Sequence, residues 1–292
     1  MRKFLTWAFA LLIIAVLSHF FYLRSKAPKE SYSEDTWLSS VKNKTALVIV
    51  AHDDDAISCA GTITQLSKAG WTVKELCFYN QVSDPKKIER NVQRQKDIQK
   101  VKEIEGLSSF EFFTLPFRNL EKVSTPEYMP VTADEFDTQY NKDTLLFYIR
   151  RMIDDNKPSV IFTLDNQLGG YGHPDHKLVS QLVYDECLQR SKDSSYSVEY
   201  IYQGVFTPSM NENIVSSLPV YQAVIKMYKQ KNPLPDVQIT ISDAGAEKKK
   251  VLQTYSTEQN SLKKFWPYYN YYPASIYFRL FDREFFRTIK LK

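Results

Sequence analysis

The sequence predicts an α/β domain whose mostly parallel sheet carries helices on both faces, preceded by one N-terminal transmembrane helix. Short, continuous apolar runs at 46–50 and 159–164 are typical of strands buried on both faces. Segments with helical spacing alternate with these and other strand-like runs, the pattern of a parallel sheet with crossover helices. An uncharged apolar run of 20 residues, Phe4–Leu23, indicates the transmembrane helix.

Composition places the chain among ordinary folded proteins. Of its 292 residues, 43% are hydrophobic and 25% are charged, which excludes a disordered chain. The net charge is only +4, with basic and acidic residues mixed along the chain, so no nucleic-acid partner is expected. The three cysteines, Cys59, Cys77 and Cys187, form no CxxC pair, which excludes a disulfide framework and a cysteine-rich zinc module.

Residues 1–30 are interpreted as a single-pass membrane anchor. With a rise of about 1.5 Å per residue, the apolar run is long enough to cross the roughly 30 Å hydrocarbon core. A cleaved signal peptide is the alternative, because Val16-x-Ser18 is a passable cleavage site. The lack of an A-x-A pattern near Ser18 and the continuation of the apolar run past that point favour an uncleaved anchor. Basic residues flank both ends, and the short N-terminal tail favours an extracytoplasmic domain.

A polar tether at 31–44 is expected to connect the anchor to a domain over 45–292. The first strand is predicted at 46–50 (ALVIV), and a helix over 57–69 follows it and ends before a glycine. Residues 73–79 alternate between apolar and polar side chains, which is typical of a strand.

The next helix has the clearest boundaries in the sequence. Asp84 is a suitable N-cap, Pro85 suits the first helical position, and the helical spacing continues to Gly106. A further strand is predicted at 110–115 and a further helix at 144–155.

The second half of the domain continues the alternation. A buried strand at 159–164 (SVIFTL) precedes a helix over 174–190. Strands are expected at 198–206 and 237–241, and an aspartate opens a helix over 243–255. In such sheets ligands bind at the carboxyl ends of the strands.

Two histidine–aspartate clusters follow the two buried strands. The first is 52–55 (HDDD), and the second is 169–176 (GGYGHPDH). Three of the four histidines lie in these clusters, and the fourth, His19, lies in the anchor. Either cluster alone could serve as a helix cap. Adjacent carboxylates, however, raise each other's pKa unless a cation offsets them, so the two clusters together predict a metal site.

The types of side chain suggest which metal is bound. Two imidazoles and one carboxylate suit zinc, with a fourth position open to water as in catalytic sites. The same donors suit ferrous iron, so a site for Zn²⁺ is expected and Fe²⁺ stays open.

The two motifs, AHDDDA and GHPDH, resemble those of the PIG-L/LmbE family of zinc-dependent de-N-acetylases. The family's motifs are usually AHPDDE and HPDH or HxxH. Weaker likenesses are Arg94 and Asp97 near an R-x-x-E motif, Gly106, and TYSTEQ at 254–259, which extend the resemblance over 45–287. The resemblance implies a Rossmann-like fold and removal of the N-acetyl group from an N-acetylglucosamine-type sugar, as in N-acetylglucosaminyl-phosphatidylinositol.

The resemblance also implies roles for individual residues. Asp54 matches the general base, and His173 matches the histidine that polarises or protonates the reacting amide. Asp175 matches the carboxylate that orients His173, and we expect it to keep that imidazole charged. Arg94 and Tyr171 are candidate substrate-binding residues, with a solvated helix arginine as the alternative for Arg94. The implied metal ligands are His52, Asp55 and His176.

Two positions depart from the family's first motif. Asp53 replaces the usual proline and Ala56 replaces the usual glutamate. Because of these changes, the protein could bind its metal more weakly, act on an atypical substrate or be a catalytically inactive relative.

The sequence therefore predicts a membrane-tethered, zinc-dependent deacetylase of an N-acetylated amino sugar in a glycan or glycolipid. The main alternative is an anchored glycosyltransferase that binds its metal through Asp53-x-Asp55, a DxD motif. That alternative leaves His52 and the GHPDH segment unexplained. A non-catalytic carbohydrate-binding protein with the same fold is the third possibility.

The C-terminal stretch 265–286 is rich in aromatic residues. We expect them to complete the core or to form a lid over the site, because aromatic side chains bury large areas. A sugar-stacking or membrane-facing surface is the alternative.

Overall fold

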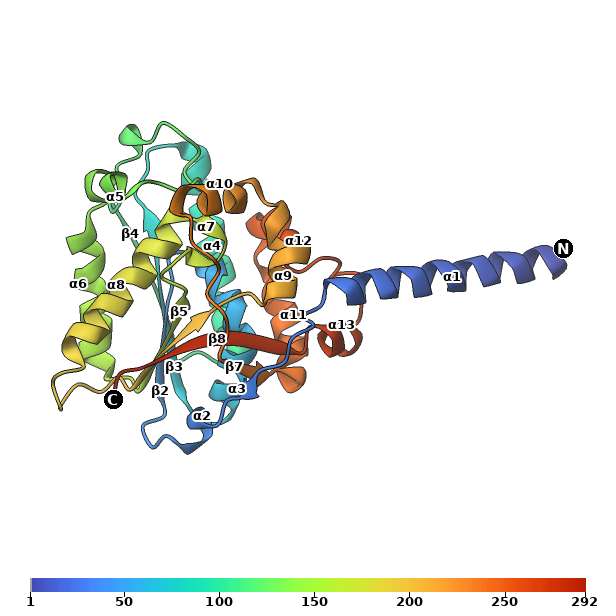
Figure 1. Ribbon diagram of the computed structural model, residues 1–292, viewed down its shortest axis with the longest axis horizontal. Coiled ribbons are helices and arrows are strands. Elements are labelled where there is room, and N and C mark those ends of the chain that lie inside the picture. Colours follow the sequence, from blue (N-terminus) through green and yellow to red (C-terminus); the bar gives the residue numbers. More distant parts are fainter. Residues whose placement is uncertain (1) are drawn as a thin grey trace.

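The computed structural model describes residues 2–292, so residue 1 of the predicted anchor lies outside it. An eight-stranded sheet forms the centre of the molecule, and helices cover both of its faces (Figure 1). Its strands are β1 (Ser33–Glu34), β2 (Thr45–Ile49), β3 (Thr72–Asn80), β4 (Ser109–Leu115), β5 (Val160–Leu164), β6 (Tyr200–Gly204), β7 (Val237–Thr240) and β8 (Arg283–Lys290). They are ordered β1-β7-β8-β6-β5-β2-β3-β4, and only β8 runs antiparallel to its neighbours. The predicted fold class is confirmed.

Strand β2 shows why its sequence is apolar at almost every position. Ala46 and Val48 pack into one hydrophobic cluster, whereas Leu47 and Ile49 pack into a second cluster on the opposite face of the sheet. Its neighbour β5 is aligned with Ala46 opposite Val160. A strand covered on both faces needs apolar residues in both alternating sets, which is the ALVIV pattern.

The helices of the described chain surround this sheet. The predicted helices correspond to α3, α4, α6, α8 and α11, and the predicted strands correspond to β2 through β7, with bounds that differ by a few residues. The helices are α1 (Arg2–Lys26), α2 (Trp37–Ser40), α3 (Ala60–Lys68), α4 (Pro85–Glu105), α5 (Ala133–Gln139), α6 (Lys142–Asn156), α7 (Gly169–Gly172), α8 (Pro174–Arg190), α9 (Pro208–Asn213), α10 (Pro219–Tyr228), α11 (Gly245–Thr254), α12 (Gln259–Phe265) and α13 (Ala274–Leu280).

Helix α4 begins and ends where its sequence predicts. The Asp84 side chain accepts a hydrogen bond from the backbone N–H of Lys86, and Pro85 occupies the first turn. Gly106 ends the helix with φ of 71°, a left-handed conformation that favours glycine.

The polar segment expected to be a tether is part of the fold. Ser33 and Glu34 form edge strand β1, which pairs with β7. Trp37 packs on Tyr200 with 4.6 Å between the ring centroids. A two-residue strand made of polar side chains carries no periodic signal, so this pairing could not be predicted from the sequence.

Helix α1 projects away from the body as an isolated rod (Figure 1). Within the described residues it is the one helix long and apolar enough to cross a membrane, a test that a signal sequence also passes. Its body-side end is packed, because Leu23 is fully buried.

The C-terminal aromatic residues divide into two groups. Tyr268 and Tyr271 are exposed. Most of the others complete the core, as expected: Tyr269, Tyr277, Phe278, Phe281, Phe285 and Phe286 are buried.

Candidate metal centre and active site

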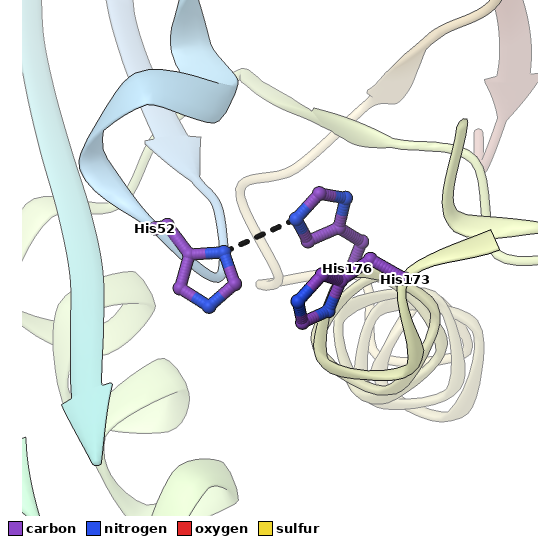
Figure 2. Close-up of side chains that lie close together, drawn as sticks. All are labelled: His52, His173 and His176. Atoms are coloured by element: carbon purple, nitrogen blue, oxygen red, sulfur yellow. Dashed lines mark hydrogen bonds between the residues drawn. The ribbon is translucent and has the colours of Figure 1, made fainter. Parts of the chain in front are cut away.

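The two histidine–aspartate clusters meet at one edge of the sheet. Strands β2 and β5 are parallel neighbours, so their carboxyl ends lie side by side. A 3₁₀ turn, Asp53–Cys59, follows β2, whereas a glycine-rich turn and helix α8 follow β5. Figure 2 shows His52 facing His173 and His176 across the gap between these segments.

The turn after β5 is shaped by one buried carboxylate and by glycine. Asp165 accepts hydrogen bonds from the backbone N–H groups of Gln167, Leu168 and Gly170. Gly172 has φ of 110°, and a Cβ there would lie 2.7 Å from Val224 Cγ1. A larger residue would therefore push the chain away from the position from which α8 starts.

Three predicted metal ligands converge on one point. His52 Nδ1 lies 3.1 Å from His176 Nε2, and His176 Nε2 lies 3.0 Å from Asp55 Oδ1. The third separation, from His52 Nδ1 to Asp55 Oδ2, is 3.6 Å. Ligands about 2.0–2.2 Å from a tetrahedral zinc ion lie about 3.4 Å from one another. The donor set and its spacing therefore fit a single divalent ion.

Neighbouring groups fix which nitrogen of each imidazole faces this point. His176 Nδ1 lies 3.2 Å from the Gly169 carbonyl oxygen, so it donates there and leaves Nε2 free. His52 Nε2 lies 3.3 Å from Asp175 Oδ2, which leaves Nδ1 free. Carboxylates that hold the outer nitrogen of a ligand in this way are typical of protein metal sites.

The charges around these ligands favour a cation. Burial alone would lower the pKa of His52, but the hydrogen bond to Asp175 and the charge of Asp55 raise it to about 9. Burial acts to raise the pKa of Asp55, yet His176 and His52 hold it at about 2. The pocket therefore keeps its carboxylate ionised and attracts positive charge.

His173 offers an alternative third nitrogen ligand. One ligand atom from each of His52, His173 and His176 lies within 4.8 Å of the others. His173 Nδ1, however, accepts a hydrogen bond from the Asp175 backbone N–H at 3.2 Å, so only Nε2 is left to reach an ion. The shorter separations around Asp55 favour the carboxylate as the third ligand.

Asp175 does not orient His173 in the way that the resemblance implies. Its Oδ2 contacts His52, whereas its Oδ1 accepts hydrogen bonds from Arg118 Nη1 at 3.3 Å and from the Tyr140 hydroxyl. Burial would raise the pKa of Asp175, but the neighbouring histidines and Arg118 hold it well below its usual range. The Asp175 carboxylate, expected to orient His173, points to the other imidazole, and Asp175 contacts the His173 ring through its backbone N–H instead.

The surroundings of His173 disfavour the charged form that the resemblance led us to expect. Burial lowers the pKa of His173 well below its usual range, and the adjacent imidazole of His176 acts in the same direction. The two rings are stacked with 4.5 Å between their centroids. A neutral His173 that accepts at Nδ1 carries its proton on Nε2.

Arg94 is buried at the centre of a cluster of carboxylates. It is only 5% exposed, and its Nη2 forms ion pairs with both Asp53 and Asp54. Its Nη1 lies 3.6 Å from Glu258 Oε1, and Arg90 binds that carboxylate from the other side. The alternative of a solvated helix arginine is wrong, and Arg94 is placed to position Asp54 at the wall of the cavity.

The residue that replaces the family's proline is part of this cluster. Asp53 is fully buried, and burial raises its pKa to about 6 although Arg94 acts to lower it. Its pairing with Arg94 directs it away from Asp55, which faces the histidines instead. A DxD metal site on Asp53 and Asp55 does not fit this arrangement. Ala56 is buried among apolar side chains.

Sequence reasoning missed some of the residues that support the site. Arg118 and Tyr140 come from segments with no recognisable motif, and only the folded chain brings them to Asp175. Glu258 lies in the TYSTEQ segment, which was a weak signal.

A cavity of about 520 Å³ opens over the clustered histidines. Asp54 and Tyr171 are among its lining residues, and the Tyr171 ring packs edge-on against His176 with 5.3 Å between centroids. Its walls combine aromatic and charged groups. Besides the site residues these include Tyr79, Asn80, Lys87, Arg90, Asn91, Tyr128, Lys264 and Phe265.

Residues 47–187 match the family model PIG-L, described as GlcNAc-PI de-N-acetylase. This match spans both histidine motifs and confirms the resemblance. No curated protein matches the chain.

The fold also matches solved structures, at low sequence identity. N,N'-diacetylchitobiose deacetylase from Pyrococcus horikoshii is 16% identical, with a TM-score of 0.53 over 85% of this chain and 84% of that chain. The zinc-inhibited form of teicoplanin deacetylase Orf2 is 14% identical, with a TM-score of 0.54 over 84% and 98% of the two chains. GalB, the 4-carboxy-2-hydroxymuconate hydratase from Pseudomonas putida, is 16% identical, with a TM-score of 0.52 over 84% and 96%. Deacetylases and a hydratase share this fold, so the reaction has to be argued from the site.

Proposed function

We propose, since this chain carries a PIG-L domain, that it is a zinc-dependent hydrolase that removes the N-acetyl group from an N-acetylglucosamine-type amino sugar. One observation carries the proposal most directly. The free ring nitrogens of His52 and His176 and the carboxylate of Asp55 lie 3.0–3.6 Å apart at the base of the cavity. Asp54 lines the same cavity and is held by Arg94.

The proposed metal ligands are His52, Asp55 and His176. When bound, a zinc ion would polarise the amide carbonyl and lower the pKa of a coordinated water to about 7. Ferrous iron suits the same donors and is the alternative cofactor.

Asp54 is the proposed general base. Arg94 Nη2 binds its Oδ1, which fixes the carboxylate beside the ligands without placing it among them. In that position it accepts a proton from the attacking water and delivers it to the nitrogen of the departing amine. Proton transfer by such a residue typically contributes about 10²–10⁴-fold to the rate.

His173 is proposed to act as a neutral hydrogen-bond donor. Its Nδ1 accepts from the backbone, so Nε2–H is free to donate to the oxygen of the tetrahedral intermediate. Removal of one such donor costs about 3–4 kcal/mol in comparable sites. Asp175 then contributes by orienting the ligand His52.

The cavity suits a sugar substrate in size and in chemistry. Its volume of about 520 Å³ is within the usual range for small-molecule sites. The aromatic rings of Tyr128, Tyr171 and Phe265 offer apolar faces for a pyranose ring, and the neighbouring amide and basic side chains offer partners for hydroxyl groups. Arg94 is committed to the carboxylates, so substrate binding at this wall is proposed for Tyr171.

The membrane anchor is part of the proposal. Helix α1 would span the bilayer once, with the domain on the extracytoplasmic side, and the substrate would be a glycan or glycolipid within reach.

Metal analysis combined with a product assay tests the proposed function. Full-length protein is incubated with N-acetylglucosaminides while released acetate and free amine are measured. We expect one zinc or iron ion per chain and equal yields of the two products. Manganese-dependent transfer or hydrolysis of a sugar nucleotide would instead indicate the glycosyltransferase. Glycan binding by metal-free protein with no acetate release would indicate a binding protein.

A further inference from the structure

The C-terminal end of α1 contacts a loop from the C-terminal part of the chain. This loop, residues 266–273, joins α12 to α13 and is called here the aromatic loop. The Tyr272 hydroxyl lies 2.6 Å from His19 Nδ1, and the Tyr268 ring meets the His19 ring edge-on with 4.5 Å between centroids. Tyr268 has φ of 63°, which is unfavourable for a tyrosine. In this conformation its ring packs against α1.

These contacts lie well along the apolar part of the helix. His19 precedes Arg24, the first basic residue after the apolar run, by five residues, or about 7.5 Å along the helix axis. If Arg24 lies among the lipid headgroups, the rings at the level of His19 lie near the boundary between headgroups and acyl chains. Tyrosine is enriched at this depth because its ring is amphipathic.

The outer face of this region has the composition of a membrane-binding surface. Tyr271 is 80% exposed, and Ile276 on α13 is also exposed. The segment Gln259–Phe281 contains no acidic residue, and its three basic residues, Lys263, Lys264 and Arg279, are exposed. An exposed aromatic and basic surface of this kind suits anionic lipid headgroups.

We propose that the aromatic loop and α13 form a membrane-docking surface that rests on the same anionic bilayer that α1 crosses. Tyr268, Tyr271 and Tyr272 enter the interface, while Lys263 and Arg279 contact headgroup phosphates. The inference rests on the proposed membrane anchor, not on the proposed reaction. Two points of attachment, one helix and one surface, then fix the orientation of the domain on the membrane.

This orientation bears on the cavity. Helix α12 runs directly into the aromatic loop, and its residues Ser261, Lys264 and Phe265 line the cavity. Docking therefore holds one wall of the cavity near the headgroups.

Depth-dependent fluorescence quenching tests the proposal on the full-length chain. The native cysteines are all buried, so a fluorophore can be attached to one introduced cysteine at a time. The variants are Tyr271→Cys in the aromatic loop, Leu12→Cys in α1 and Phe147→Cys on α6, which lies at the opposite side of the body from α1 (Figure 1). Each is reconstituted in vesicles of phosphatidylcholine and phosphatidylglycerol that carry a lipid-bound quencher.

We expect quenching of at least about twofold at positions 12 and 271 and almost none at Phe147→Cys. Quenching at Leu12→Cys without quenching at Tyr271→Cys would overturn the docking surface and leave the anchor intact. Absence of quenching at Leu12→Cys would overturn the anchor itself. A Tyr271→Cys label that is shielded from aqueous iodide but not quenched by lipid would place the surface against another protein and contradict the proposal. Acetate release from the same vesicles reports separately on the proposed reaction.

The charges are tested by a paired variant, Lys263→Glu with Arg279→Glu. Both side chains are exposed, so the fold should be unaffected. We expect quenching at Tyr271→Cys to fall in this background in anionic vesicles and to change little in pure phosphatidylcholine. Equal quenching in both lipids, with and without the paired variant, would show that Lys263 and Arg279 do not contribute to docking on the membrane.

Discussion

At the residue scale, the site is organised by which carboxylate holds which cation. Asp175 contacts His52, Asp55 faces His52 and His176, and Asp53 and Asp54 share Arg94. The carboxylates therefore have different partners, although three of them are adjacent in sequence. This division assigns a different consequence to the loss of each one.

Asp54→Asn should lower kcat by about 10²-fold or more while metal content is unchanged. The amide cannot accept a proton from water, but the proposed ligands His52, Asp55 and His176 stay in place. Steady-state deacetylation and metal analysis of the same preparation provide the measurement. Wild-type activity in this variant would remove Asp54 from the role of base.

Asp175→Asn should weaken metal affinity by about 10–100-fold, because the carboxylate that fixes the His52 tautomer is lost. Competition with a chelator measures this affinity. If Asp175 acted on His173 instead, the variant would keep its metal affinity and lose only kcat, so the two outcomes separate the observed contact from the one that the resemblance implies.

At the element scale, α4 links the 3₁₀ turn Asp53–Cys59 to the C-terminal region. Arg94 and Arg90 are one helical turn apart on α4, and both bind Glu258, which follows α11. The 3₁₀ turn after β2 is joined to the same point through Asp53 and Asp54. The position of Asp54, the proposed base, thus depends on how α4 packs near Glu258, although both are distant from Asp54 in sequence.

Arg94→Met should lower the free energy of unfolding by about 3–5 kcal/mol, because it leaves buried carboxylates without a counter-charge. Urea denaturation measures the loss. Arg94→Lys is the matched control and should recover part of the stability, since it restores the charge without the planar guanidinium. A neutral effect of Arg94→Met would show that the cluster does not depend on this ion pair.

At the scale of the whole molecule, the sequence predicted the parallel core and the location of the site. Both rest on local signals: the apolar runs of β2 and β5, and the HDDD and HPDH motifs that follow them. What it missed depends on contacts between distant segments. Strand β8 reads as an aromatic-rich tail until it pairs with β6 and β7, and Arg118 and Tyr140 acquire a role only by reaching Asp175.

The partner of the Asp175 carboxylate could not be predicted from the sequence for a related reason. A motif gives spacing along the chain, whereas the direction of a side chain depends on what surrounds it. Here Arg118, Tyr140 and His52 together draw the carboxylate away from His173.

A buried carboxyl in the core makes overall stability depend on pH. Glu75 is fully buried, and its carboxyl oxygens have no hydrogen-bond partner among residues 2–292. Burial, aided by Glu105, raises its pKa well above the usual value. The folded chain keeps this proton while the unfolded chain releases it near pH 4.5, so the contribution of Glu75 to stability falls as pH rises above that value.

Glu75→Gln should therefore stabilise the fold at pH 8 by about 1–3 kcal/mol, because the amide does not ionise. The gain should shrink towards pH 4.5, where both states hold the proton. Thermal or urea unfolding at several pH values measures it. A gain that did not vary with pH would show that Glu75 does not titrate with folding.

Calorimetric titration of the metal-stripped, full-length protein with Zn²⁺ tests the assignment of His52, Asp55 and His176 as the ligands of one divalent ion. We expect one ion per chain in the wild type and in His173→Ala, with binding lost or greatly weakened in His176→Ala and Asp55→Ala. Loss of binding in His173→Ala together with undiminished binding in Asp55→Ala would contradict it.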